Sequence, residues 1–304
     1  MTNELAASLA ERSSKIRSWM LAIRPLTLTL SLAPVAVGAT LAWAETGRTR
    51  PAVVAGAGVA AALIQIGTNL YNDAADHRRG GDGPQRLGPP RVTAQGLLSG
   101  AAVARAAFVA FGVAAVIGVG LVCVGGWPIL ALGLLSIVCG LGYSGGPYPI
   151  AYSPFGESFV ILFFGVAAVC GTFWLAASVL APAPVVAGLA LGLFAAAALL
   201  ANNHRDREED ARVGRRTLAI VIGPRWTRVT YGAFVLTPFA LLAPLAGLEP
   251  TSHAPLALAA APIAAGLALR FASEPPGRGF NQILAWTAQT QALFAALLCW
   301  GATW

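Results

Sequence analysis

Charged residues are scarce in this chain of 304 residues. Only 11% of the residues are Asp, Glu, Lys or Arg, whereas 57% are hydrophobic. Soluble domains carry about 25% charged residues, and so few charges could not cover the surface of an ordinary soluble fold. The composition therefore excludes an ordinary soluble protein and indicates that much of the surface faces lipid.

The chain has only four cysteines, and they do not form a metal-binding pattern. Cys123, Cys139, Cys170 and Cys299 lie in apolar runs at no metal-ligand spacing. We expect them to be small apolar packing residues.

The net charge of +7 does not indicate nucleic-acid binding, because no basic face is interleaved with aromatic residues.

Long runs without any charge dominate the remainder of the chain. Five of them fit one membrane span of about 20 residues, and two longer ones each fit two spans. The longer runs break at "GGWP" and "APAP", where Gly and Pro disfavour a continuous helix. Barrel strands would alternate apolar and polar residues, and these runs do not. The sequence therefore predicts an all-α integral membrane protein with nine transmembrane helices. The runs are Pro25–Ala44, Pro51–Asn72, Ala106–Gly156, Ser158–His204, Val229–Leu248, Pro250–Leu269 and Gly279–Trp304.

Basic residues predict the orientation in the membrane. With nine spans, the N-terminal tail shares one side with residues 73–100, 143–157, 205–228 and 270–279. Counting Arg105 at the mouth of its span, that side holds 18 of the 20 Lys and Arg residues, and the other side holds only Arg48 and Arg50. The positive-inside rule makes this side cytoplasmic, with the N-terminus inside and the C-terminus outside. We expect a multi-pass protein of the plasma (inner) membrane.

The chain is expected to form one membrane domain with a short leading segment. Residues 1–23 mix charged and apolar residues and lack the apolar core and cleavage site of a signal peptide. They are predicted to form a cytoplasmic interfacial helix. Residues 24–304 are predicted to be a single transmembrane domain.

Acidic residues gather in two short stretches. Seven of the 13 lie in "NLYNDAADHRRGGD" (Asn69–Asp82) and "NNHRDREEDARVGRRTLAIVIG" (Asn202–Gly223). In the first, Asn69, Asp73 and Asp76 are spaced four and three apart, which is one helix face. In the second, Asn202, Asp206 and Asp210 are spaced four and four apart. Both faces are predicted at cytoplasmic span ends.

Like charges on one helix face repel, so these faces suit a bound cation. Oxygen ligands favour Mg²⁺ or Ca²⁺, and Mg²⁺ usually completes its shell with water and substrate phosphates. Arginines lie beside both stretches at Arg78, Arg79, Arg91 and Arg205. Since guanidinium groups bind phosphate oxygens, the two stretches together predict a metal-bridged diphosphate site.

Two other interpretations of these residues stay open. Acidic residues at helix ends also cap helices or solvate loops, and either stretch alone would fit that role. His77 and His204 flank the stretches and are expected to be solvated in loops. Asn and Asp in a membrane protein can also mark the ion path of a cation-coupled transporter. Transporter sites lie near the bilayer midplane, however, and these acids gather at one membrane face.

The stretches resemble the aspartate-rich motifs of the UbiA superfamily of intramembrane prenyltransferases. The spacing of Asp73, Asp76 and Asp82, followed by "RLGPPRVTAQGLLS", is similar to the menaquinone-forming branch, the 1,4-dihydroxy-2-naphthoate polyprenyltransferases. So are "YSGGPYPIAYSPFGE" (Tyr143–Glu157), "RPLTLTLSLAPVAVG" in the first span and "NQILAWTAQTQALF" in the last. Branches acting on hydroxybenzoate or haem carry a Lys-Arg pair after the tyrosine. This chain has Ser-Gly-Gly-Pro there, so another cation, Arg24 or Arg91, has to contact the diphosphate.

The resemblance implies nine helices around a central cavity that opens to the cytoplasm and laterally to lipid. It implies Mg²⁺-dependent transfer of a polyprenyl group from an allylic prenyl diphosphate to 1,4-dihydroxy-2-naphthoate, with decarboxylation to demethylmenaquinone. A different aromatic acceptor (homogentisate, a chlorophyllide or a natural-product phenol) is the alternative. The implied partners are the two substrates and the bilayer, with no nucleic acid and no obligatory protein partner.

The resemblance also implies roles for individual residues. Asp76 or Asp82 would orient or deprotonate the acceptor, and the choice between them stays open. Tyr143 and Tyr152 would line the acceptor site, or else belong to the interfacial aromatic belt. The implied catalytic residues are Asp73, Asp76, Asp82, Asp206 and Asp210, and the implied Mg²⁺ ligands are Asn69, Asp73, Asp76, Asn202, Asp206 and Asp210. The implied diphosphate contacts are Arg24, Asn69, Asn72, Arg78, Arg91, Asn202, Asn203 and Arg205.

Overall fold

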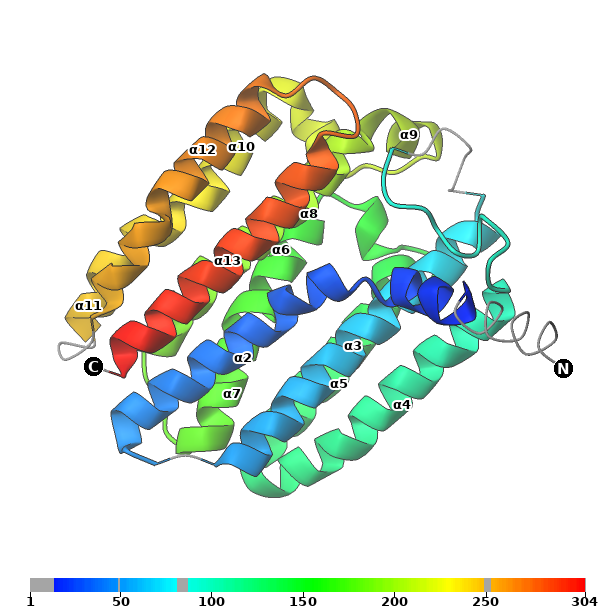
Figure 1. Ribbon diagram of the computed structural model, residues 1–304. Coiled ribbons are helices and arrows are strands. Elements are labelled where there is room, and N and C mark those ends of the chain that lie inside the picture. The colour runs from blue at the N-terminus through cyan, green and yellow to red at the C-terminus, as the bar shows by residue number, and fades with distance from the viewer. Residues whose placement is uncertain (1–13, 49, 81–86, 249–252, 304) are drawn as a thin grey trace, which may run out of the picture.

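Helices form at every predicted membrane span. The computed structural model describes residues 14–48, 50–80, 87–248 and 253–303. Within these ranges, nine helical segments are long and apolar enough to cross a membrane, and no strand occurs. The predictions of an all-α membrane protein and of nine spans are therefore confirmed (Figure 1).

The first five spans follow the predicted runs closely. A turn at Gly126, which has a positive φ of 69°, separates two of them within "GGWP". Only glycine adopts this backbone conformation readily, so the sequence breaks the long apolar run at this point. These spans are α2 (Pro25–Thr46), α3 (Pro51–Arg78), α4 (Gly100–Gly125), α5 (Trp127–Ser144) and the continuous helix α6–η2–α7 (Gly156–Ile161, Leu162–Ala167, Ala168–Ala177); η1 (Ile150–Tyr152) precedes the fifth.

The last four spans begin at the "APAP" break, where α8 starts at Ala183. The sixth span, α8, is the most enclosed, with 78% of its apolar window buried. Gly223, with φ 74° and ψ 172°, kinks the seventh span near its start. The elements are α8 (Ala183–Arg205), the short α9 (Arg207–Arg212), α10 with α11 (Leu218–Ala240, Leu242–Leu248), η3 with α12 (Ala254–Ala260, Ala261–Ser273) and α13 (Phe280–Ala302).

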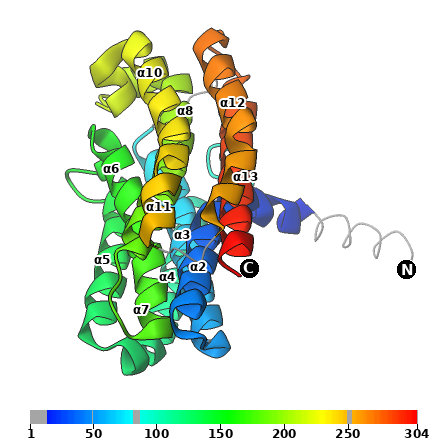
Figure 2. The same cartoon turned by 90° about the vertical axis from the view of Figure 1, so that its left-hand side faces the viewer.

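The spans pack as two neighbouring groups. α3 lies against α4 and α5, whereas α8 lies against α10 and α13, and α12 covers α10 (Figures 1 and 2). α2 joins the groups because it packs against α3 of the first and α13 of the second. The largest cluster of buried apolar residues lies in the α8 group and includes Phe194, Tyr231 and Phe294.

A glycine-lined contact holds the fifth span against α8. The middle of the fifth span, η2, is a π-helical turn, a feature that is frequent at functional sites. A Cβ on Gly165 would lie 2.3 Å from the carbonyl oxygen of Gly188, and one on Gly192 would lie 2.5 Å from that of Ile161. The two backbones therefore touch, as small residues allow in membrane helices.

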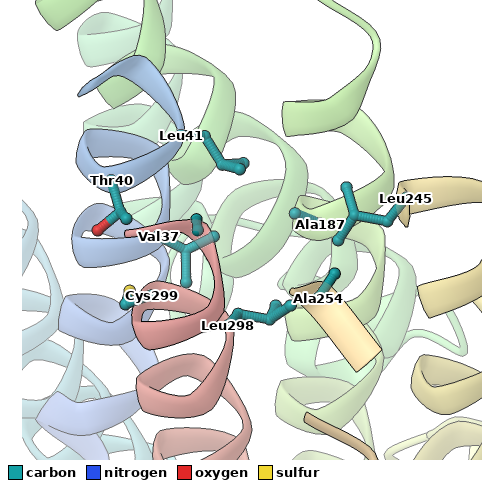
Figure 3. Close-up of a pocket in the computed structure, with 9 residues that line it drawn as sticks. Val37, Thr40, Leu41, Ala187, Leu245, Ala254, Leu298 and Cys299 are labelled. Atoms are coloured by element: carbon teal, nitrogen blue, oxygen red, sulfur yellow. The ribbon is translucent and has the colours of Figure 1, made fainter. Parts of the chain in front are cut away.

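Near the opposite end of the bundle from the acidic stretches, α2, α8, α11, η3 and α13 leave only a small gap. It measures about 10 Å³ and is lined by apolar side chains together with Thr40 and Cys299 (Figure 3). A cavity of this size holds at most one water molecule. We interpret it as a packing gap and not as a ligand site.

The described part of the predicted N-terminal segment is helical over residues 14–23. This helix turns away from the bundle axis in Figure 2, with Ile16 and Met20 exposed and Ala22 buried. Residues 1–13 lie outside the described residues. The interfacial role of residues 1–23, and the single domain over 24–304, stay predictions.

The contact between η2 and α8 generates a stability prediction. A Cβ on Gly188 would lie 2.7 Å from the Cα of Val166, so G188A has to push two backbones apart. Overpacking of this kind costs about 1–3 kcal/mol. We expect G188A to lower the midpoint of thermal unfolding in detergent. The control is G112A on α4, where a Cβ meets nothing within 4 Å. An equal effect of both substitutions would contradict the described packing.

Candidate active site

One arginine joins the two acidic stretches. Arg215 places one guanidinium nitrogen 2.8 Å from Asp76 of the first stretch and another 3.1 Å from Asp210 of the second. Asp76 and Asp210 lie at the ends of α3 and α9, far apart in the sequence. The predicted convergence of the two stretches at one end of the bundle is thus present in the structure.

The guanidinium of Arg215 packs against the ring of Tyr152. Its guanidinium lies 4.8 Å from the ring centre of Tyr152, and that of Arg79 lies 5.3 Å from the same ring. Burial lowers the pKa of Arg215, but the nearby carboxylates of Asp76 and Asp210 outweigh burial and raise the pKa above its ordinary value. The sequence prediction missed Arg215, although it belongs to "GRR" (Gly214–Arg216) within the second stretch.

The first stretch is tied to the loop that follows it. Arg91 donates to Asp76 at 2.8 Å and to Asn72 at 3.3 Å. Asp73 accepts from the backbone N–H groups of Val92 and Thr93, each at 3.3 Å, and from the Thr93 hydroxyl. In this structure Asp73 therefore fixes the loop that carries Arg91, which differs from its predicted role as a metal ligand.

The second stretch is organised by Arg205. Its guanidinium donates to the carboxylate of Asp206 at 2.6 and 2.7 Å, to Asn202 at 2.7 Å and to Asn281 of α13 at 2.5 Å. Arg205 is almost fully buried, so these bonds form away from water. The predicted single helix face is interrupted, because α8 ends at Arg205 and Asp206 lies in a turn before α9. Backbone N–H groups of Asp206 and Asp210 nevertheless donate hydrogen bonds to the carbonyl groups four residues earlier, those of Asn202 and Asp206, as in a helix.

A cavity of about 610 Å³ begins beside these groups. Its wall runs along α3 from Asn72 to Ala57, which corresponds to about 22 Å of helix. Deep in the cavity the wall is apolar, with residues from α3, α4, α5 and the fifth span, including Phe159, Phe163 and Phe164. The charged and asparagine side chains that line the cavity gather at one end, together with Tyr143: Arg24, Asn69, Asn72, Arg91, Asn202, Asn203, Asp206 and Arg215. Uncharged polar side chains, among them Gln65, Ser136 and Thr172, also contribute to the lining.

Some predicted site residues lie elsewhere. Arg78 is exposed and does not line the cavity. Its guanidinium lies 5.9 Å from the ring centre of Tyr71. Tyr152 supports Arg215 from outside the wall. Asp82 lies outside the described residues. The expectation that His204 is solvated is wrong, because it is buried between Phe271 and Phe280, while His77 is exposed as expected.

The oxygen atoms at this site are of the kinds that bind a hard divalent cation, but in this structure they are not arranged around one. Carboxylate and amide oxygens from both stretches are the ligands that Mg²⁺ prefers. Within the described ranges, however, no three His, Cys, Asp or Glu residues are arranged to hold a metal ion. Arginine supplies the positive charge at Asp76, Asp206 and Asp210. A divalent ion at this end would take over carboxylate oxygens that guanidinium groups now contact.

Comparison with known proteins agrees with the fold and the acidic ends. The family model described as "UbiA prenyltransferase family" matches residues 31–279. The chain belongs to the UbiA prenyltransferase family. It is 35% identical to "1,4-dihydroxy-2-naphthoate octaprenyltransferase" of Escherichia coli (strain K12), over 70% of this chain and 71% of that protein. It is 36% identical to the protein of the same name from Mycobacterium tuberculosis (strain ATCC 25618 / H37Rv), over 82% and 86%.

The fold of the family is shared with a solved structure. A UbiA homologue from Archaeoglobus fulgidus bound to DMAPP and Mg²⁺ superposes with a TM-score of 0.65 at 15% identity, covering 94% of this chain and 99% of that one. The resemblance found in the sequence is therefore confirmed, and as a UbiA member the chain is a prenyltransferase.

The bridge at Arg215 predicts competition with divalent cations in this UbiA member. R215A removes a partner from a largely buried ion pair, so we expect a lower midpoint of thermal unfolding without metal. Added Mg²⁺ should then stabilise R215A more than the unchanged protein, because Arg215 no longer competes with the cation for Asp76 and Asp210. The measurement is thermal unfolding in detergent with and without Mg²⁺.

The matched control is R225A, because the side chain of Arg225 is exposed on α10. It should behave like the unchanged protein. Equal stabilisation by Mg²⁺ in all three proteins would show that the cation and Arg215 do not share these carboxylates.

Proposed function

We propose that this protein transfers a polyprenyl group from an allylic prenyl diphosphate to 1,4-dihydroxy-2-naphthoate, giving demethylmenaquinol, the hydroquinone form of demethylmenaquinone, with loss of carbon dioxide. The observation that carries the proposal is the pair of acidic ends, bridged by Arg215, above a deep apolar cavity. The names of its relatives in Escherichia coli and Mycobacterium tuberculosis support the choice of acceptor.

The polar end of the cavity is where the diphosphate binds. Arg24, Arg91 and Arg215 line this end and bring positive charge to phosphate oxygens. Asp76, Asp206 and Asp210, with Asn69 and Asn202, would hold Mg²⁺, while Asp73 keeps the loop of Arg91 in place. When bound, Mg²⁺ supplies positive charge that stabilises the departing diphosphate. The solved UbiA homologue carries this ion together with DMAPP.

The apolar part of the cavity holds the prenyl chain and shelters the allylic carbon. The cavity follows α3 over about 22 Å in all, polar end included, so a long isoprenoid tail can be buried along it. As the bond from carbon to the diphosphate oxygen breaks, positive charge develops on the allyl group. The aromatic faces of Phe159, Phe163 and Phe164 stabilise that charge, and their apolar surroundings exclude water.

The acceptor ring then forms the new carbon–carbon bond. The ring carbon that carries the carboxylate attacks the allylic carbon, diphosphate leaves with the electrons of the broken bond, and loss of carbon dioxide restores aromaticity. Tyr143 lines the cavity at the height of the diphosphate end, so it is suitably placed to contact the acceptor. The proposed setting is the inner membrane, with the site open to the cytoplasm. The distribution of basic residues supports this orientation.

The direct test is an assay of the purified protein with labelled polyprenyl diphosphate and a set of aromatic acceptors. We expect prenylated, decarboxylated product from 1,4-dihydroxy-2-naphthoate, and little from homogentisate, chlorophyllide or simple phenols. A chelator should abolish the reaction and Mg²⁺ should restore it. Preferential use of another acceptor would replace the proposed substrate, whereas turnover in the presence of chelator would contradict the metal-assisted departure of diphosphate.

A further inference from the structure

A buried carboxylic acid lies beside the cavity without any role so far. Glu157, in the first turn of α6, is only 2% exposed. No ion pair among the described residues includes it. Burying a carboxyl group near the membrane without a basic partner is costly, and such groups generally serve a function.

Asn203 is the side chain that donates a hydrogen bond to Glu157 within the described chain. The amide nitrogen of Asn203 donates to one carboxylate oxygen of Glu157 at 2.9 Å. The second oxygen of Glu157 is also buried, and the described residues offer it no hydrogen-bond partner. A carboxylate can only accept, so it fixes which way the amide of Asn203 faces.

This bond leaves the carbonyl oxygen of the Asn203 side chain as the group available to a ligand. Asn203 lines the cavity, whereas Glu157 lies behind the wall. Tyr143 is close by, because a Cβ on Gly156 would lie 3.9 Å from its hydroxyl oxygen. The ends of α5 and α8 and the start of α6 thus place hydrogen-bond acceptors at the polar end of the cavity.

This corner and the arginines suit different substrates. A diphosphate is repelled by a carboxylate and attracted by Arg24, Arg91 and Arg215. A phenolic hydroxyl is a neutral donor, and it needs an acceptor when it leaves water. We propose that Glu157 is a positioning residue that orients Asn203 to accept a hydrogen bond from a ring hydroxyl of the aromatic acceptor. The inference rests on the proposed function and names the residues that hold its second substrate.

The test compares ligand binding with and without hydroxyl donors. Binding of 1,4-dihydroxy-2-naphthoate and of its dimethyl ether is measured by calorimetry on the unchanged protein, E157A, E157Q and N203A. We expect the unchanged protein to bind the dihydroxy compound roughly tenfold more tightly than the ether, as one hydrogen bond allows. E157A and N203A should lose most of that difference, and E157Q should keep it because a glutamine oxygen can still accept from Asn203.

Three further measurements separate positioning from a structural effect. S158A, which changes the exposed neighbour of Glu157, serves as the control. In turnover assays E157A should raise the KM for the acceptor by roughly tenfold and leave the KM for prenyl diphosphate unchanged. The double variant E157A/N203A should be no worse than N203A alone, since both residues act through one contact. If E157A does not fold, the inference is tested by N203A, which should lose the preference for the dihydroxy compound, and by E157Q, which should keep it.

Several results would overturn the inference. They are equal discrimination between the two compounds in N203A and the unchanged protein, additive losses in the double variant, or equal KM increases for both substrates. Failure of the proposed function would look different. The unchanged protein would then form no product from the naphthoate, whereas the comparison of the two compounds needs no turnover.

Discussion

The bridge from Asp76 through Arg215 to Asp210 is the contact on which the site depends. It joins the end of the span α3 to the short helix α9 that follows the span α8. Carboxylates that face one another repel, so a cation has to lie between them. In this structure the cation is a guanidinium, and under the proposed function a diphosphate with its metal ions would occupy the same position.

The charge arrangement also explains how one end of the cavity can hold two different substrates. Arg24, Arg91 and Arg215 provide anion-binding groups, whereas Glu157 and Asn203 lie at a corner where hydrogen-bond acceptors predominate. Farther along the cavity the wall is mostly apolar, so it suits an isoprenoid tail, whereas a charged headgroup is better solvated at the polar end. The tight backbone contact of η2 with α8 holds Phe163 and Phe164 on that wall.

The sequence predicted the spans and the acidic ends because both depend on local patterns. Apolar runs interrupted at Gly126 or by proline are visible in a single chain, and acids are conspicuous where they are rare. Contacts between distant residues were not visible in this way. Arg215 meets Asp76 only through the fold, Asp73 turns toward Thr93, and Arg78 is exposed and does not line the cavity. Helical periodicity shows which residues share a face, but not which neighbour that face meets.

The most direct measurement is electron paramagnetic resonance of Mn²⁺, used in place of Mg²⁺, with a prenyl thiodiphosphate that cannot react. If the two acidic ends share one headgroup, D76N and D210N should each abolish the bound-metal signal and its coupling to phosphorus. Each substitution should do so alone, because the ligands act as one site. A full signal in either variant would show that the two ends do not hold a common diphosphate, and the account would be wrong.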